Sequence, residues 1–342
     1  GTVTAGGAFV CVNSPANFSV QTQFGTHLAA HGGAADPNAL YTYWAGANDL
    51  FTAAGKGAAA ASMAAQAGLT AVGQIKALQA AGANNIVVFN MPDLGLTPQF
   101  RGTALQASAT GLATLYNVQL NDGLATADDG IVAINAYGLI NEIIANPSAF
   151  GITHPTGMAC PASSLACGPA SSGYPTAPIS STYLFADAIH PTGAAHALLA
   201  NVVYATLSAP AFVSLAPETA MATAFNHNTA INDALDSEWA AGSEVSKIRG
   251  FASVQYGQQD IDATAYTPGL DGDSIDLNLG ATYRMNEGAT FGLAATLGNS
   301  SSDAGNIGSF KGSSILVGVF GQYEVNGLYG RLSYSGGNTD ME

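Results

Sequence analysis

Charged residues are scarce in this sequence, and basic residues are the scarcest. Only 9% of the 342 residues are charged, and 8 lysines and arginines stand against 23 acidic residues, which gives a formal net charge of −15. Nucleic-acid phosphates and anionic membrane surfaces attract basic proteins and repel acidic ones. We therefore expect no nucleic-acid partner and no binding to an anionic membrane surface. A chain low in charge and rich in Gly, Ala, Ser and Asn favours an exported bacterial protein.

Long apolar runs and cysteines are also few. No uninterrupted run of 18 apolar residues occurs, so the sequence predicts no helical membrane span. Of the three cysteines, Cys160 and Cys167 flank a short loop rich in Pro, Ala and Ser. They could close a small disulfide ring in an oxidising compartment, and a pair of free thiols is the alternative. No second cysteine pair or histidine cluster completes a metal site, so we expect neither a metal nor a cofactor.

The segment Asp187-Ala188-Ile189-His190-Pro191 places a carboxylate and an imidazole three residues apart, just before an apolar helix. An Asp can accept a hydrogen bond from one ring nitrogen of a His while the other nitrogen takes a proton from a nucleophile. Pro191 suits the first position of the helix, where a missing N–H costs nothing. The alternative is a helix cap beside a partly buried histidine.

A second candidate follows the strand-like run 39–44. The tetrapeptide Gly46-Ala47-Asn48-Asp49 comes directly after it. An Asn at the end of a strand can direct its side-chain amide at an oxyanion, which is the electrostatic contribution that ester hydrolysis most needs. An Asn-Asp pair after a strand can equally form an ordinary turn.

The order of three motifs distinguishes these alternatives. Gly-Gly-Ala at 6–8, Gly-x-Asn-Asp at 46–49 and Asp-x-x-His at 187–190 resemble blocks II, III and V of the GDSL (SGNH) hydrolases. The likeness is strongest to the autotransporter esterases of that family. It runs through Ala-Asp-Pro-Asn-Ala-Leu-Tyr at 35–41, Pro-Asp-Leu-Gly-Leu-Thr-Pro at 92–98 and Leu-Phe-Ala-Asp at 184–187. These motifs are weak singly and specific in combination.

The resemblance implies a role for each matching residue. His190 would be the general base and Asp187 the carboxylate that orients it. Asn48 and the backbone N–H of Gly7 would donate to the oxyanion, with Gly6 as the near alternative to Gly7. The implied partner is an ester or lipid substrate.

One block of the family is missing. Its Gly-Asp-Ser-Leu motif carries the nucleophilic serine, and no such tetrapeptide occurs in the 342 residues. Because that block precedes Gly-Gly-Ala in relatives, we expect this chain to begin after it, so that it holds no nucleophile. Ser14 and Ser19 are the nearest serines to the N-terminus. Neither lies in a strand-to-helix elbow signature, and we expect both to be surface or turn residues.

The first part of the chain alternates between helical and strand patterns. The expected helices are 17–31, 56–81, 102–126, 136–145 and 192–207, and the expected strands are 39–45, 85–90 and 130–135. Such alternation predicts a parallel sheet flanked by helices, with ligands bound at the C-terminal ends of the strands. The resemblance makes this a three-layer α/β/α fold of the SGNH-hydrolase type.

The organisation changes after residue 215. We expect a hydrolase domain over 1–215, a linker helix within 216–246 and a β segment over 247–342. The linker helix is expected to be polar over 218–240. The β segment shows five alternating stretches at 249–257, 274–283, 290–297, 314–323 and 328–334. Strands of roughly 10 residues with one apolar face are typical of outer-membrane barrels, and five cannot close a barrel that needs at least about 8. A soluble β-sandwich is the alternative.

The apolar face of these strands is predicted to contact lipid. Its expected members are Phe251, Leu277, Leu279, Phe291, Leu293, Val317 and Val319. Autotransporters of the resembled family join a passenger domain to a translocator barrel through a helix in the barrel lumen. On this resemblance the chain carries an incomplete antiparallel outer-membrane β-barrel segment, with its passenger displayed at the bacterial cell surface.

Two functions follow from these expectations. The first is a carboxylic-ester hydrolase of the Ser-His-Asp type, displayed at the outer membrane, whose serine is absent from this chain. The second is a non-catalytic passenger or adhesin. Asn48 and the Asp187/His190 pair favour the first, and the missing serine block favours the second for this polypeptide.

Overall fold

The structure of the protein, a computed structural model, describes residues 2–3, 9–10, 19–160, 163–164, 181–240, 242, 244–264, 267–305 and 307–342. The chain divides into two compact units, 1–204 and 205–342. The predicted domain bounds at 215 and 246 stay predictions.

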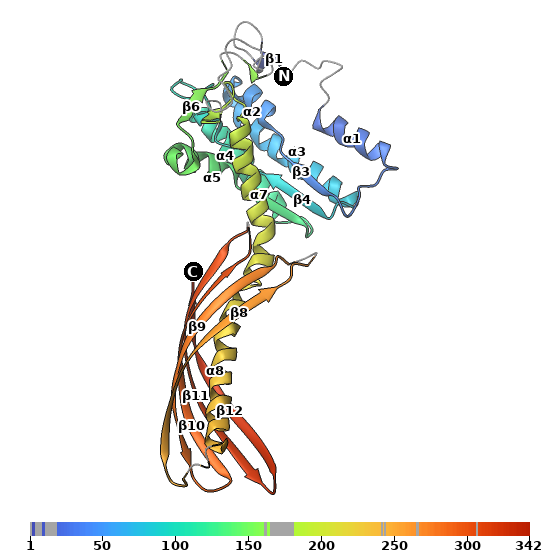
Figure 1. Ribbon diagram of the computed structural model, residues 1–342. Helices are drawn as coiled ribbons and strands as arrows, with labels where there is room; N and C mark the ends of the chain where they lie inside the picture. Colours follow the sequence, from blue (N-terminus) through green and yellow to red (C-terminus); the bar gives the residue numbers. More distant parts are fainter. Residues whose placement is uncertain are drawn as a thin grey trace. The chain divides into compact units, whose positions relative to one another are not determined.

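Unit 1 is built on a parallel sheet of three strands in the order β3-β4-β5 (Figure 1). The strands are β3 (Leu40–Tyr43), β4 (Asn85–Phe89) and β5 (Ile131–Ile134). The helices are α1 (Val20–Ala30), α2 (Ala47–Ala54), α3 (Ala60–Ala80), α4 (Gln106–Leu124), α5 (Ala136–Ala145) and α7 (Gly193–Val213), with short 3-10 turns at Gly57–Ala59, Leu94–Leu96 and Pro147–Phe150. The predicted parallel α/β arrangement is confirmed.

The central strand β4 shows why the fold has three layers. Ile86 and Val88 lie in the core formed with helices α2, α3 and α4. Val87 and Phe89 lie in a second core with residues of α5 and α7. Successive side chains of a strand point to opposite faces, so an uninterrupted apolar run requires cover on both sides. Helices supply that cover on each face.

In the described part of unit 1, one helix and four strands were not predicted. They include α2, which has only eight residues, and the paired strands β6 (His154–Met158) and β7 (Tyr183–Phe185). The strand β6 carries Pro155 and Gly157, which are depleted in strands. A further short pair, β1 (Thr2–Val3) and β2 (Phe9–Val10), is antiparallel.

The expectation of no membrane-crossing helix is corrected by one stretch. By length and composition Gly193–Ala240 could cross a membrane, with a mean hydropathy of 1.6 in its most apolar window. Asn201 and other polar residues interrupt it, which is why a search for unbroken runs missed it. Length and composition alone do not make it a span, because Leu199, Val202 and Val203 of α7 pack in the core of unit 1.

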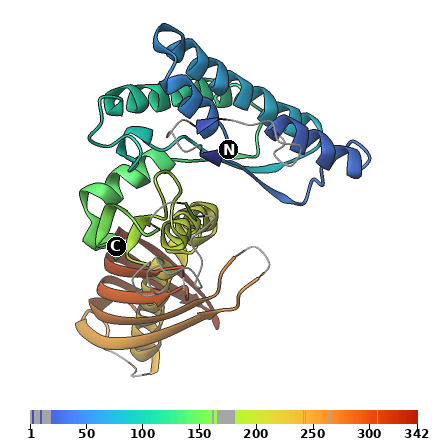
Figure 2. The same cartoon turned by 90° about the horizontal axis from the view of Figure 1, so that it is seen from above.

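Unit 2 is an antiparallel sheet of five strands with a helix against it (Figures 1 and 2). The helix is α8 (Ala216–Ala240), and the strands are β8 (Ile248–Ile261), β9 (Leu270–Arg284), β10 (Ala289–Asp303), β11 (Ser309–Val325) and β12 (Leu328–Met341). Each strand pairs with its sequence neighbour. The strands have 14 to 17 residues, so the prediction of about ten was too short. The alternation of apolar and polar residues that predicted the strands is lost where outward positions are polar, as at Asn299 and Ser301, so the predicted strands ended too early.

The two faces of the sheet differ in chemistry. On β9 the buried positions facing α8 include Ser274, Asp276 and Asn278, and the exposed positions between them are Ile275, Leu277 and Leu279. The same alternation places Leu293, Leu297, Val317 and Val319 on the exposed face. This apolar exterior with a polar interior confirms the outer-membrane type of β segment. The β-sandwich alternative is wrong, because a helix rather than a second sheet covers the inner face.

One member of the predicted apolar face was wrong. Phe251 points inward, where its cross-strand partner is Gly280. A Cβ on Gly280 would lie 2.2 Å from Cζ of Phe251, so the glycine makes room for the ring. The ring packs with Ile231 and Leu235 of α8. We misassigned Phe251 because a large apolar side chain was taken to mark the lipid side of every strand.

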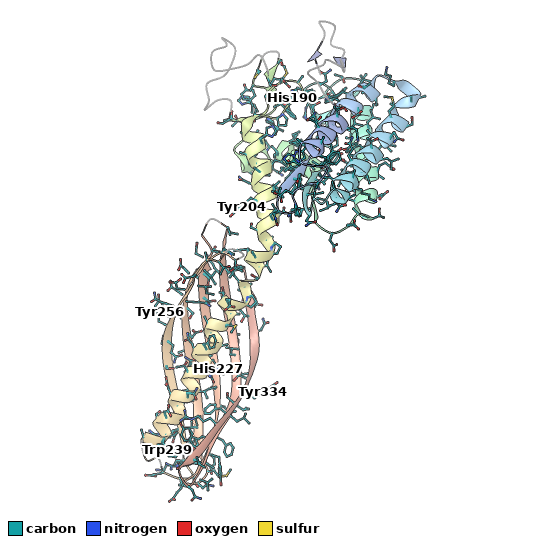
Figure 3. The ribbon with its side chains drawn as sticks, turned by 90° about the vertical axis from the view of Figure 1, so that its right-hand side faces the viewer. His190, Tyr204, His227, Trp239, Tyr256 and Tyr334 are labelled. Carbon is teal, nitrogen blue, oxygen red and sulfur yellow. The ribbon has the colours of Figure 1, made fainter. Side chains whose placement is uncertain are left out.

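The first half of α8 meets the sheet through polar groups. His227 is buried, with its Nδ1 2.7 Å from Oγ1 of Thr296 and its Nε2 3.0 Å from Oγ of Ser335 (Figure 3). One residue earlier, Nδ2 of Asn226 donates to Oδ2 of Asp276 at 2.6 Å. A helix over 218–240 is confirmed, but its predicted polar character holds only for the first half, because Ile231 and Leu235 pack in an apolar cluster with Phe251.

Candidate active site

The loop that joins β7 to α7 carries Asp187 and His190. Its ends are held together, because the backbone N–H of Ala186 donates to the carbonyl of His190 at 2.8 Å, and Pro191 forms a bridge with Phe185. The helix begins at Gly193, one residue after the predicted bound of 192 and two after Pro191, which was predicted to suit its first position. Thr192 caps it, with Oγ1 accepting the N–H of Ala195 at 3.1 Å. Pro191 therefore lies outside α7.

The loop brings the two predicted side chains together. Nδ1 of His190 lies 2.9 Å from each carboxylate oxygen of Asp187. The carboxylate is buried, whereas the His190 side chain is 58% exposed at the end of unit 1 (Figure 3). A buried acid next to an accessible imidazole leaves the other ring nitrogen, Nε2, free to face a reacting group. Because Thr192 caps α7, Asp187 is not the helix cap of the alternative interpretation.

The surroundings of Asp187 keep its carboxylate charged. Burial alone would raise the pKa of Asp187, because a buried charge loses its hydration. Backbone N–H groups of Ser164, Ile189 and His190 donate to it at 2.8, 3.0 and 2.9 Å, and His190 adds its ring. These bonds outweigh burial and hold the pKa well below its usual range. The carboxylate can therefore stabilise an imidazolium at neutral pH.

The second candidate, Asn48, lies in the first turn of α2 and not in a loop or turn. The chain turns from β3 into α2 at Gly46, whose φ is +103°. A Cβ there would lie 2.5 Å from the ring of Tyr116, whose hydroxyl donates to the carbonyl of Ala45 at 2.7 Å. Both the backbone angle and the close approach require glycine. Asn48 is thus held on a rigid helix start.

Asn48 and His190 line the same cavity, of about 270 Å³. The other lining side chains are mostly apolar and include Trp44, Phe51, Met91, Leu94, Ile140 and Phe185. An amide donor, an imidazole and an apolar pocket are thus gathered at the C-terminal end of the sheet. This arrangement can bind an uncharged apolar group, take up a proton and stabilise a developing negative charge.

Several predicted residues lie outside the described part of the chain. These are Gly6, Gly7, Ser14 and Cys167. Cys160 is disulfide-bonded, and its pairing with Cys167 stays a prediction. Ser19 caps α1, with Oγ accepting the N–H of Thr22 at 3.2 Å, as expected of a turn residue.

The sequence interpretation missed two contributors. Ser164 donates to Asp187 from a distant loop, and its hydroxyl lies 3.5 Å from Nδ1 of His190. That nitrogen already faces the carboxylate, so Ser164 is not where a nucleophile for Nε2 would lie. The other is Asn117, a buried amide on the core side of α4. A polar residue on an apolar helix face was its available signal. Over the described ranges, no group of three or more His, Cys, Asp or Glu could hold a metal.

Comparison with known proteins gives two family matches. Residues 12–203 match the GDSL-like Lipase/Acylhydrolase family, and residues 250–342 match the Autotransporter beta-domain. The chain is 31% identical to esterase EstA of Pseudomonas aeruginosa over 331 residues, which cover 92% of this chain and 49% of the relative. It is 26% identical to lipase 1 of Photorhabdus luminescens over 276 residues, covering 62% of this chain and 43% of the relative.

A GDSL esterase/lipase of Arabidopsis thaliana is 30% identical over 145 residues, covering 38% of each chain. The plant relative thus extends over a much smaller part of the chain than the bacterial ones. The chain spans about half the length of the bacterial relatives named here.

Proposed function

Because the chain belongs to the GDSL-like lipase/acylhydrolase family, we propose that the protein is a carboxylic-ester hydrolase that uses His190 and Asp187 with a serine nucleophile. The observation that carries the proposal is the shared cavity of Asn48 and His190, with Asp187 buried behind the imidazole. Its substrate would be an ester or a lipid.

The mechanism assigns one task to each group. Nε2 of His190 takes the proton of the serine hydroxyl as its oxygen attacks the ester carbonyl. Asp187 stabilises the imidazolium, and the amide of Asn48 donates to the oxyanion, together with the backbone N–H of Gly7. His190 then returns the proton to the leaving alkoxide. Water repeats the cycle on the acyl-enzyme.

Unit 2 sets where this chemistry takes place. The autotransporter β-domain match and the EstA relative indicate a bacterial outer-membrane protein with the hydrolase domain at the cell surface. The apolar exterior of the sheet agrees, since lipid-facing positions of outer-membrane strands are apolar. We propose that outer-membrane lipid contacts Leu277, Leu293 and Leu297.

The function is tested by comparing two proteins on a short p-nitrophenyl ester. We expect the full-length gene product to turn over the ester at an esterase rate. The 342-residue chain should show no triad-dependent turnover, since it lacks the Gly-Asp-Ser-Leu block. Its residual rate would come from the oxyanion donors and binding alone. Turnover by the chain that disappears with Ser14→Ala would identify a nucleophile in the chain. An inactive full-length product would favour the passenger or adhesin.

The membrane assignment of unit 2 predicts the effect of an outward charge. Leu297 lies on the exposed face near the middle of β10, opposite Leu277. Leu297→Arg should lower the free energy of unfolding from lipid vesicles by about 2–4 kcal/mol, because a cation would enter hydrocarbon. Unfolding in denaturant measures this. Leu69→Arg, at an exposed leucine of α3, is the control and should change little. Equal effects of the two changes would contradict lipid contact at β10.

A further inference from the structure

We propose that Met91 and Leu94 close the inner end of an acyl-binding pocket beside Asn48 and His190, and that they limit it to acyl chains of about ten carbons. The proposal rests on the proposed ester hydrolase function, because it assigns the cavity to the acyl group of the substrate. It concerns how long a chain the site accepts.

The cavity is suited to a hydrocarbon chain. Among the described residues that line it, the polar groups are Asn48, His190, His196 and the indole N–H of Trp44, and none is Lys, Arg, Asp or Glu. A charged or strongly polar substrate group would be buried there without partners, which is costly. An acyl chain would meet apolar side chains along its whole length.

Burial gives the cavity a direction. Asn48 and His190 are exposed, and Trp44 beside them is 37% exposed. Met91, Phe185 and Leu94, by contrast, are 1%, 3% and 5% exposed. The carbonyl of a substrate must lie at the exposed end, where Asn48 and His190 act on it. Its hydrocarbon tail then points towards Met91 and Leu94.

The inner end is held rigid at Met91. The backbone N–H of Met91 donates to Oδ1 of Asn117 at 2.7 Å, and Nδ2 of Asn117 donates back to the Met91 carbonyl at 2.8 Å. Asn117 is buried in α4. One amide thus fixes both backbone groups of the residue, so Met91 cannot withdraw to admit a longer chain.

The segment after Met91 is held as firmly. Oδ1 of Asp93 accepts the N–H of Gly95 at 2.9 Å and the hydroxyl of Thr110 at 2.6 Å. A Cβ on Gly95 would lie 2.2 Å from Oγ1 of Thr110, so this segment already touches α4. Leu94, which lies between these anchors, is itself buried in the core of unit 1.

The volume then sets the chain length. An apolar cavity of about 150 Å³ holds benzene, with six carbons, so the 270 Å³ here accommodates on the order of ten carbons. Each buried methylene should tighten binding by about fourfold while there is room for it. Beyond that length added methylenes stay outside and gain much less.

The experiment uses Trp44 as the reporter. The chain has two tryptophans, so Trp239→Phe leaves Trp44 as the only one. The full 342-residue chain in lipid nanodiscs is titrated with saturated fatty acids of about six to fourteen carbons. The change in Trp44 fluorescence, at the end of the cavity where the carboxyl group binds, gives the dissociation constant for each length. Empty nanodiscs provide the correction for partition into lipid.

We expect affinity to rise about fourfold per carbon up to about ten carbons and then to level off. Met91→Ala should move that break by about two to three carbons, the length of the removed side chain. Met63→Ala is the matched control, since Met63 packs in the core of unit 1 outside the cavity, and it should leave the break in place. Leu94→Ala repeats the test should Met91→Ala melt at a much lower temperature.

The proposal is overturned by a steady rise in affinity through fourteen carbons, or by a break that moves in neither Met91→Ala nor Leu94→Ala. Binding needs no nucleophile, so these results are independent of turnover. A break at about ten carbons with an inactive full-length product would reject the hydrolase function alone.

Discussion

Replacing His190 by alanine in the full-length gene product should lower kcat for a short p-nitrophenyl ester by about 10⁴- to 10⁶-fold. The reason is that Nδ1 of His190 is bonded to Asp187, which leaves Nε2 to take the serine proton in the cavity that His190 lines. Steady-state kinetics measures the loss. His154→Ala is the matched control, because that ring stacks on Tyr183 away from the cavity.

Asp187→Asn should cost less, by about 10⁴-fold, because the general base remains but its tautomer and charge stabilisation are lost. The lowered pKa of Asp187 adds a pH criterion. A carboxylate with a lowered pKa stays ionised from neutral pH down to well below its ordinary value near 4. Titration of Asp187 therefore contributes no change in kcat/KM between about pH 5 and 7. A kcat within tenfold of the parent for either variant would disprove the pairing.

Asn48→Ala is expected to lower kcat by about 10²- to 10³-fold with little change in KM. The amide is used mainly in the transition state, when negative charge develops on the carbonyl oxygen. Asn48→Asp should be worse than Asn48→Ala, since a carboxylate would repel that oxygen. Asp49→Asn, one residue along α2 and outside the cavity lining, serves as the control. A change confined to KM would make Asn48 a substrate-positioning residue.

The sequence predicted elements wherever a residue pattern was long or its chemistry was specific. The buried run of β4 and the alternation of β9 to β11 each have one structural explanation, two-sided helical cover and a lipid-exposed sheet respectively. Asp187 and His190 were predicted to act as a pair because they are only three residues apart, and a loop can bring side chains at that separation into contact. These are local relations, and local sequence carries them.

What could not be predicted depends on contacts between distant segments. The Ser164 N–H bonds Asp187 across 23 positions, and the Asn117 clamp on Met91 crosses 26. Neither leaves a periodic signal. The inward turn of Phe251 has the same origin, since only its pairing with Gly280 on the next strand shows that space exists for the ring. The start of α7 was misplaced because Thr192 and Pro191 both suit a helix start.

The polar contact between the first half of α8 and the sheet has a calorimetric consequence. Exposing apolar surface raises the heat capacity of unfolding, whereas exposing polar surface lowers it. Separation of Thr219, Asn226 and His227 from the strand hydroxyls and the carboxylate that they contact would expose polar surface. The enthalpy of this separation should therefore vary little with temperature. The free energy of unfolding the apolar core of unit 1 should curve strongly with temperature. The free energy of separating the first half of α8 from the sheet should change almost linearly with temperature.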